Sequence, residues 1–232
     1  MASSSAAARR LKTFTLSGTA CPPRLELLTR SAAHTGGVIW DSGVILARYL
    51  CQMPSLCKGK RVLELGSGTG VAGLTAAACG ADFVLLTDLR IGVDLLKENV
   101  QHNKLNDRVR VSALEWGNST HIQHARNVLQ ESNKRGFDLI LGSDVLYDSK
   151  QIGHLMSTVD ALAAEGSDIF IAAPSKNCRN SNLSHFERID EFSTPKEEGF
   201  RAPGSPISLL HAQGGEGQRL RPGGSASWFW GG

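Results

Sequence analysis

The sequence has little that would point to a secreted, metal-bound or membrane protein. Its five cysteines in 232 residues include no CxxC pair, which argues against a structural zinc site and is typical of reduced intracellular thiols. No apolar stretch approaches the roughly 18–20 residues that cross a bilayer. The net charge of +3 is mild and spread along the chain, so we expect no nucleic-acid-binding face.

Several catalytic motifs are also missing. The sequence has no serine-centred nucleophile elbow and no phosphate loop ending in Gly-Lys-Ser/Thr, which removes two common enzyme classes. His121 and His124 are spaced to share a helix face, but a zinc site needs at least a third protein ligand and none is evident. We therefore predict no metal centre.

The N-terminal segment "MASSSAAARRLKTF" has no acidic residue before Glu26, and its Ser, Ala and Arg content would suit an organelle transit peptide. Against this, the runs "LKTFTL" and "RLELLT" alternate apolar and polar residues and are separated by Gly18 and Pro22–Pro23. That pattern is typical of two paired strands. We predict a disordered tail over residues 1–9 and a folded domain over residues 10–200 that begins with the strand pair.

Short β-rich runs alternate with helical patterns through the body of the chain. Two of the helical segments end at Gly80 and Gly166, which suit helix C-terminal caps. Strand–helix alternation predicts an α/β fold, a mostly parallel sheet with helices on both faces. The carboxyl ends of all its parallel strands then lie at one ligand-binding edge. The expected strands are residues 61–65, 82–88, 108–116, 137–147 and 167–174.

The composition changes from about Arg201 onwards. Residues 201–232 are crowded with Gly, Pro and Ser, show no sustained periodicity and end in "WFWGG". This composition predicts an irregular C-terminal tail, with a structured C-terminal subdomain as the alternative.

The stretch "VLELGSGTGVAG" joins a predicted strand to a predicted helix through alternating glycines. In one frame, Gly68-x-Gly70-x-x-Gly73 matches a dinucleotide-binding fingerprint, with Asp88 at a suitable distance downstream. That frame begins two residues late, because the strand already ends at Leu65.

The frame that fits the strand end is Glu64-x-Gly66-x-Gly68-x-Gly70, with an acid inside the strand. A carboxylate there would repel a pyrophosphate but would suit the ammonium and sulfonium of S-adenosylmethionine (SAM). Asp88 ends the next strand, where a carboxylate can accept hydrogen bonds from both ribose hydroxyls. We therefore expect SAM as the cofactor, with Glu64 and Asp88 beside it. A dinucleotide, or a tight turn without a ligand, is the alternative.

Further segments match the order and spacing of a known family. "GGVIWDSGVILARYL", "VLELGSGTGVAGL", "TDL", "LEWG" and "FDLILGSDVLYD" follow one another along the chain. Together they resemble the seven-β-strand protein-lysine methyltransferases of the methyltransferase-like 21 group, within methyltransferase family 16. The resemblance runs from about Phe14 to Phe200. It implies a Rossmann-like class I SAM-dependent methyltransferase fold and methyl transfer to a lysine side chain of a protein substrate.

The resemblance also implies which residues contact the cofactor. Trp40 of "VIWD" matches the tryptophan that lines the SAM pocket, and Trp116 of "EWG" matches the residue beside the adenine. Each ring would offer a flat apolar wall and some cation–π attraction to a sulfonium, with ordinary core packing as the alternative. The other matched positions are Gly66, Ser67 and Gly68 at the methionine part, Asp88 at the ribose, and Ser143 at the end of the fourth strand.

The expected catalytic residues, Asp144 and Tyr147, lie in the segment "SDVLY". A lysine must be neutral to attack a methyl group, although its unperturbed pKa is about 10.4. A partly desolvated slot favours the neutral amine, and a nearby carboxylate can orient it or guide its proton away. The alternative is that Asp144 caps a turn and Tyr147 packs. The segment differs from the "[ND]PP[YF]" loop that resembles adenine or glutamine N-methyltransferases.

The C-terminal part departs from the family pattern. Relatives continue after the fifth strand with a helix and an antiparallel strand pair, but nothing after Phe200 shows that pattern. We therefore predict that the strand pair is missing or altered. This leaves two alternatives to an active lysine methyltransferase: a SAM-binding but catalytically weak isoform that acts by binding a partner, or a small-molecule methyltransferase.

The resemblance also bears on partners and location. Family relatives act on chaperones, AAA-type ATPases and translation factors, which implies an abundant folded protein as the substrate. We expect a monomer in the cytoplasm, with the nucleus as a further location, and neither a nucleic-acid nor a membrane partner.

Overall fold

The computed structural model describes residues 9–15, 24–30, 35–129, 136–179, 183, 186–194, 202 and 204–214. The predicted tails fall mostly outside these ranges, because residues 1–8 and 215–232 are not among them. Within the described ranges, no helix is long and apolar enough to cross a membrane.

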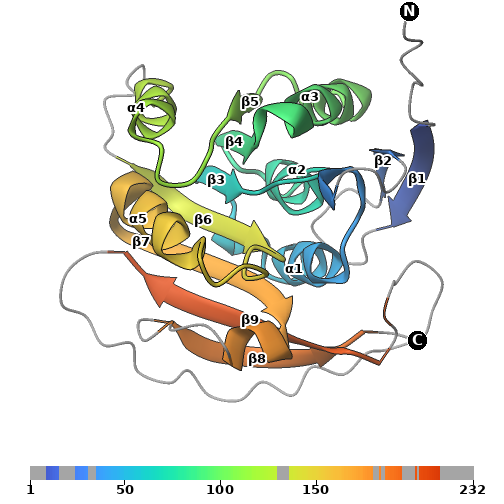
Figure 1. Cartoon of the computed structure of the whole chain (residues 1–232). Helices are drawn as coiled ribbons and strands as arrows, with labels where there is room; N and C mark the ends of the chain where they lie inside the picture. Colours follow the sequence, from blue (N-terminus) through green and yellow to red (C-terminus); the bar gives the residue numbers. More distant parts are fainter. Residues whose placement is uncertain are drawn as a thin grey trace, which may run out of the picture.

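A seven-stranded sheet forms the centre of the molecule (Figure 1). Its strand order is β5-β4-β3-β6-β7-β9-β8. The first five strands in this order pair in parallel, which confirms the predicted parallel sheet. The strands are β3 (Arg61–Leu65), β4 (Phe83–Asp88), β5 (Val109–Ala113), β6 (Phe137–Ser143), β7 (Ala163–Pro174), β8 (Glu187–Ser193) and β9 (Pro206–Gln213).

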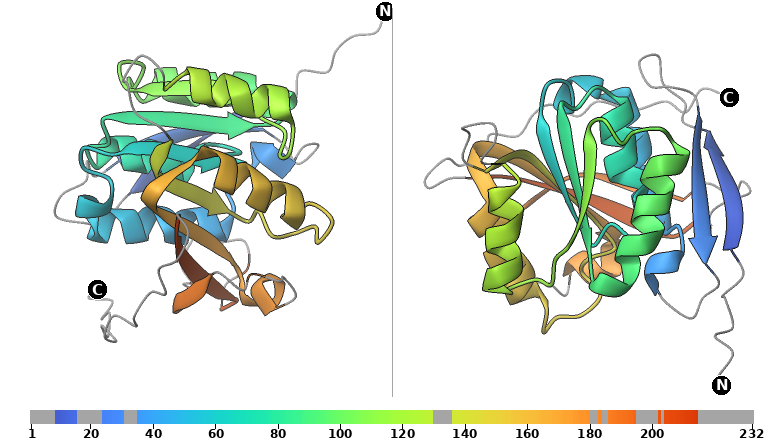
Figure 2. Two further views of the ribbon diagram at one scale, coloured as in Figure 1. Left: turned by 90° about the vertical axis from the view of Figure 1, so that its left-hand side faces the viewer. Right: turned by 90° about the horizontal axis from the view of Figure 1, so that it is seen from above.

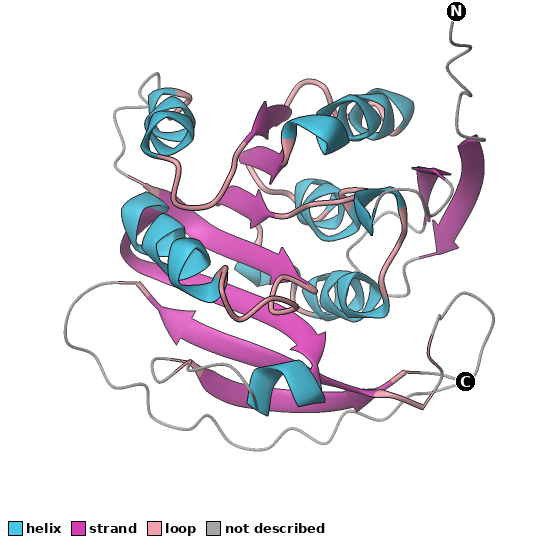
Figure 3. Ribbon diagram, viewed as in Figure 1, coloured by secondary structure: helices cyan, strands magenta, loops and turns pink. Residues whose placement is uncertain are grey.

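Helices cover both faces of this sheet (Figures 2 and 3). On one face, α1 (Asp41–Gln52), α2 (Val71–Ala78) and α3 (Val93–His102) share a buried core with every second residue of the strands. On the other face, α4 (Ser119–Asn127) and α5 (Ile152–Leu162) form a second core. The short helices are α6 (Ser175–Arg179) and the 3-10 turns η1 (Thr35–Gly37), η2 (Pro54–Leu56) and η3 (Arg90–Gly92).

The prediction of a missing C-terminal strand pair is wrong. Strand β9 pairs antiparallel with β7 on one side and with β8 on the other, so the pair completes the sheet. Residues 206–213 are therefore a strand and not part of an irregular tail. Ile207 and Leu209 enter one core while Leu210 and Ala212 enter the other. A strand buried on both faces lacks apolar–polar alternation, and the surrounding Gly, Pro and Ser concealed this short apolar run.

Two polar residues of β9, Ser208 and His211, have partners, which explains how they are accommodated in the sheet. The Ser208 hydroxyl lies 2.8 Å from that of Ser175. His211 Nε2 lies 3.0 Å from Asp168 Oδ1 on β7, and the His211 ring stacks on Phe170 with centroids 4.6 Å apart. Buried polar groups that keep such partners do not oppose strand formation.

The predicted N-terminal strand pair is confirmed. Strands β1 (Arg9–Thr15) and β2 (Arg24–Arg30) pair antiparallel, with Leu11 opposite Leu28. They form a separate two-stranded sheet, and β2 packs against α3 outside the main sheet (Figure 2).

The expectation of reduced cysteines holds for Cys51 and Cys57 and fails for Cys79. Cys51 and Cys57 are free thiols, and burial raises the pKa of the Cys57 thiol to about 12. Such a thiol is a poor nucleophile because little thiolate forms. Cys79, in contrast, is disulfide-bonded.

Gly73 in α2 lies at a close helix–sheet contact. A Cβ at this position would lie 2.2 Å from Leu86 Cδ2 and 2.7 Å from Glu64 Oε2. We expect Gly73→Ala to lower the free energy of unfolding by about 1–3 kcal/mol, because well-packed cores resist added volume. Urea denaturation measures this change.

The matched control is Gly153→Ala in α5, where a Cβ would meet nothing within 4 Å. Alanine favours helix over glycine by up to about 1 kcal/mol, so this variant should be as stable as the parent or more stable. Equal losses in the two variants would contradict the role assigned to Gly73.

Candidate functional site

The candidate site lies where the direction of chain progression across the sheet reverses. The chain passes from β3 to β4 and β5 on one side and then returns to β6 on the other side of β3, and ligands bind at such reversal points. Three loops meet there. A Cβ on Gly66 after β3 would lie 3.2 Å from Trp116 Cζ2 after β5 and 3.1 Å from Val145 Cγ1 after β6.

The turn after β3 adopts a conformation that requires glycine. Gly66, Gly68 and Gly70 have φ values of 64°, 56° and 84°, in the left-handed region that other residues enter only with strain. Ser67 fastens this turn to β4: its N–H donates to Thr87 O at 2.8 Å, and its Oγ accepts from Thr87 N at 3.0 Å. The turn therefore offers bare backbone at a fixed position.

Glu64 lies deeper than expected for an acid that faces a ligand. Its side chain is fully buried, and Oε2 accepts a hydrogen bond of 3.1 Å from the N–H of Gly73 in the first turn of α2. The residue before this helix, Gly70, has no side chain to cap it, so Glu64 takes that role from the neighbouring strand. Glu64 thus supports the glycine turn from beneath.

Burial raises the pKa of Glu64 to about 8, although hydrogen bonds from Gly73, Ser67 and Ala72 oppose the shift. At neutral pH the carboxyl group is therefore largely protonated. A neutral acid is the cheaper form in a site without a counter-charge.

Asp88 lies at the tip of β4, as the sequence predicts, and it holds two backbone groups. Its Oδ2 accepts from Gly68 N at 2.7 Å and its Oδ1 from Leu89 N at 2.7 Å. Burial raises the pKa of Asp88, and these two hydrogen bonds lower it in part. The acid therefore joins the glycine turn to the loop after β4.

The turn η1 covers this acid, which the sequence analysis missed. A Cβ on Gly36 would lie 3.8 Å from both Asp88 Oδ2 and Gly68 Cα. Gly36 and Gly37 directly precede the "VIWD" segment, and an adjacent glycine pair is the signal that could have indicated a close approach between backbones.

Trp40 and Ser143 lie on the α1 side of the site. Trp40 precedes α1, keeps 38% of its surface exposed, and accepts from Gly43 N at 3.0 Å through its carbonyl. A Cβ on Gly43 would lie 3.2 Å from Ser143 Oγ. The first turn of α1 therefore rests on the end of β6, with Trp40 at the rim.

The two expected catalytic residues, Asp144 and Tyr147, differ in their surroundings. Asp144 has a φ of 56°, a left-handed conformation that is uncommon for a non-glycine residue, although Asp adopts it more readily than most. Burial raises its pKa to about 6, the neighbouring Ser42 lowers this pKa in part, and nearby Asp41 raises it. Tyr147 is 70% exposed. Within the described residues no hydrogen bond joins the two.

Asp41 adds a long-range contact that the sequence analysis did not anticipate. Its Oδ2 accepts from Ala202 N at 2.8 Å, which ties the start of α1 to the segment before β9. The C-terminal strand pair is thereby linked to the side of the site on which Asp144 lies. Partners so distant in sequence leave no local pattern.

The buried acid predicts a pH dependence of stability. Because the pKa of Glu64 is about 8 in the folded protein and 4.5 for the free group, the folded state binds the proton more tightly. The contribution of Glu64 to the free energy of unfolding is therefore largest below about pH 4.5. It is lost as the pH rises towards 8. The slope is at most about 1.4 kcal/mol per pH unit.

We expect Glu64→Gln, which keeps an acceptor for Gly73 N, to lose less stability than the parent between pH 5 and pH 8. Urea denaturation across this range measures both slopes. Asp88 and Asp144 remain in the variant, so the difference isolates Glu64. Identical slopes would show that Glu64 does not titrate as described.

No group of three or more potential metal ligands occurs in the part of the chain that the structure describes. The site therefore consists of a glycine turn, acids and aromatic rings. This composition suits an organic cofactor that carries hydroxyl groups and positive charge.

Comparison with known proteins agrees with this geometry. Relatives include mouse protein N-lysine methyltransferase METTL21A, which is 34% identical over 155 residues, or 65% of this chain and 66% of the mouse protein. Mouse EEF1A lysine methyltransferase 3 is 32% identical over 136 residues, or 58% of this chain and 54% of that protein. The chain thus matches from about half to two thirds of the length of these two relatives.

Solved structures share the fold at low sequence identity. The Thermus thermophilus 16S rRNA N2 G1207 methyltransferase, in complex with AdoMet and guanosine, superposes with a TM-score of 0.57 at 15% identity. It covers 89% of this chain and 50% of its own. For P. horikoshii TYW2 in complex with MeSAdo, the TM-score is 0.52 at 15% identity, over 88% of this chain and 70% of that chain. The described architecture is thus a class I SAM-dependent methyltransferase fold.

A family model described as "lysine methyltransferase" matches residues 21–192. This range contains the glycine turn, Asp88, Trp116 and the Asp144 segment. The chain therefore belongs to the lysine methyltransferase family, methyltransferase family 16.

Proposed function

We propose that this protein transfers a methyl group from SAM to the lysine side chain of a protein substrate. The observation that carries the proposal is the glycine turn of Gly66–Gly70, joined through Gly68 N to the carboxylate of Asp88 at the strand reversal. A bare backbone turn beside an acid at that point suits a nucleoside with a ribose diol.

The residues around the turn fit SAM. Asp88 would hold the ribose hydroxyls, and Trp116 would flank the adenine. Gly66, Ser67 and Gly68 would lie along the methionine part, with Trp40 and Ser143 on the α1 side. Glu64 would act indirectly, because its fully buried carboxyl group contacts Gly73. Bound SAM supplies an electrophilic methyl group on a sulfonium.

On the acceptor side, Asp144 has the properties of a group that orients an amine and receives its proton. Its pKa of about 6 leaves it charged at neutral pH, so it can accept a hydrogen bond from a lysine ammonium. Its left-handed backbone fixes the direction of the side chain. Tyr147 lies at the surface, where its ring can contact the aliphatic part of the lysine. Together they would position the amine and exclude water.

The names of the relatives suggest the substrate class. EEF1A lysine methyltransferase 3 names a translation elongation factor as its substrate, and a Candida glabrata relative is named as a protein N-terminal and lysine N-methyltransferase. A translation factor is accordingly our first candidate substrate, with chaperones and AAA-type ATPases as further candidates. Such substrates would place the reaction in the cytoplasm.

A catalytically weak isoform would follow from a missing C-terminal strand pair. Strands β8 and β9 are both present in the sheet, so the structure does not favour this alternative. The contact between Asp41 and Ala202 also links this pair to the acceptor side. A small-molecule acceptor has no observation in its favour.

The first prediction for this function concerns cofactor affinity. Asp88→Ala removes the acceptor for the ribose and for Gly68 N, so we expect SAM binding to weaken by about 2–4 kcal/mol, or roughly 30- to 1,000-fold. Asp88→Asn is the matched control, because its amide oxygen can still accept from Gly68 N, and its loss should be smaller. Calorimetric titration of SAM that gives the parent affinity for Asp88→Ala would refute the assignment.

The second prediction separates binding from chemistry. The parent should transfer labelled methyl groups from SAM to lysine residues of cell-lysate proteins. Both Asp144→Asn and Tyr147→Phe should keep the SAM affinity of the parent. Asp144→Asn should lower the transfer rate by about 100-fold or more, because positioning of the amine and proton transfer are impaired. Label in methyl-lysine after acid hydrolysis reports the activity. Absence of label from lysine in the parent would contradict the proposed function itself.

A further inference from the structure

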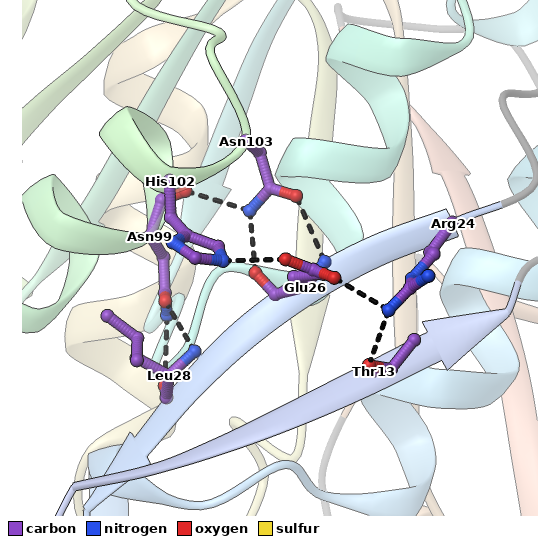
Figure 4. A network of polar contacts seen from close by, with 7 residues as sticks. All are labelled: Thr13, Arg24, Glu26, Leu28, Asn99, His102 and Asn103. Carbon is purple, nitrogen blue, oxygen red and sulfur yellow. Dashed lines mark hydrogen bonds and ion pairs between the residues drawn. The ribbon is translucent and has the colours of Figure 1, made fainter.

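Asn99 in α3 and Asn103, the C-cap residue of that helix, bind the free edge of β2 as a neighbouring strand would (Figure 4). Asn99 accepts from Leu28 N at 2.7 Å and donates to Leu28 O at 3.1 Å. Asn103 accepts from Glu26 N at 3.0 Å and donates to Glu26 O at 2.8 Å. The spacing of the two asparagines fits the spacing of the strand. Residues four apart in a helix are separated by about 6 Å along its axis, and residues two apart in a strand by about 6.6 Å.

Each asparagine makes one more hydrogen bond, and here the two differ. Asn103 Nδ2 donates to Asn99 O at 2.8 Å, at the C-terminal end of α3. Asn99 Nδ2 donates to Thr69 O at 2.9 Å. Thr69 belongs to the glycine turn "GSGTG", so of these two asparagines it is Asn99 that connects the N-terminal strand pair with that turn.

The connection continues from β2 to the other wall of the site. A Cβ on Gly37 would lie 3.0 Å from Arg30 Cβ at the end of β2, so η1 packs directly on that end. Within η1, Gly36 lies over Gly68 and Asp88. The position of β2 therefore sets the position of η1 above the glycine turn.

We infer that Asn99 is a positioning residue for the cofactor site. Through Leu28 it fixes β2 and hence η1, and through Thr69 O it fixes the glycine turn, so one side chain sets the spacing between two walls of the site. This inference rests on the proposed SAM-dependent function. Asn103 anchors the same strand but does not touch the glycine turn.

The chemistry of the contact explains why an amide is required. Asn99 is fully buried, and both of its N–H donors are used, one on Leu28 O and one on Thr69 O. A carboxylate of the same shape would face these two carbonyl oxygens without a proton to share. Buried acceptors left without donors are costly, so the two walls would move apart.

The test compares Asn99→Asp with Asn103→Asp. Each variant loses two donated bonds to carbonyl groups and keeps the accepted bond from β2, but only Asn99→Asp releases Thr69. We expect the Kd for SAM to rise at least about tenfold in Asn99→Asp and to stay within about threefold in Asn103→Asp. The KM for SAM should follow the Kd, with kcat at saturating SAM unchanged. Melting temperatures report the structural cost of each variant.

Asn99→Ser and Asn103→Ser form an uncharged second pair, for which the same order of Kd values is expected. A purely structural role for Asn99 predicts that affinity follows stability in all four variants. Equal Kd values for the Asn99 and Asn103 variants would therefore overturn the inference.

A measurement on the parent protein needs no variant to fold. Amide hydrogen exchange followed by NMR should show that SAM slows exchange at Leu28 N–H more than at Glu26 N–H. The Leu28 N–H donates to Asn99, which also binds the glycine turn, whereas the Glu26 N–H donates to Asn103, which does not. Equal effects on the two amides would refute the coupling. A parent that binds no SAM would contradict the proposed function, whereas a parent that binds SAM without this difference would contradict the role of Asn99 alone.

Discussion

The left-handed glycine turn after β3 is the constraint on which the rest of the site depends. Its three glycines have no side chains to hold them, so neighbouring residues must fix the turn. Glu64 caps the following helix from beneath through Gly73 N, and Asp88 accepts from Gly68 N. Asn99 donates to Thr69 O. Each of these residues lies on a different element, and the turn is rigid because β3, β4 and α3 all converge on it.

The parts of the site that follow from backbone geometry could be predicted from the sequence. The strand ending at Leu65, the alternating glycines and Asp88 at the next strand tip are local patterns, and the structure places them together at one edge. Glu64 shows the limit of that reasoning. Its position in a strand was evident, but its direction depends on how closely α2 approaches β3, which Gly73 determines.

Two features could not be read from local patterns for a different reason. Strand β9 lies between two other strands, so its short apolar run is shared between both cores and lacks alternation. The periodicity of α3 indicates its apolar face but passes over Asn99, because the partners of Asn99 are backbone groups of Leu28 and Thr69. A side chain that bonds to backbone groups does not restrict which amino acid stands at the partner position. The sequence therefore contains no pattern that links the two positions.

Burial raises the pKa of two acids that flank the site, Asp88 and Asp144. Each therefore carries its negative charge at a cost in the protein alone. A cation brought close to them relieves that cost, since an opposite charge favours the ionised form. SAM carries a sulfonium and an ammonium, and the acceptor lysine arrives as an ammonium. The same acids that strain the unliganded site thus favour the two positively charged reactants, and binding of either should stabilise the fold by mass action.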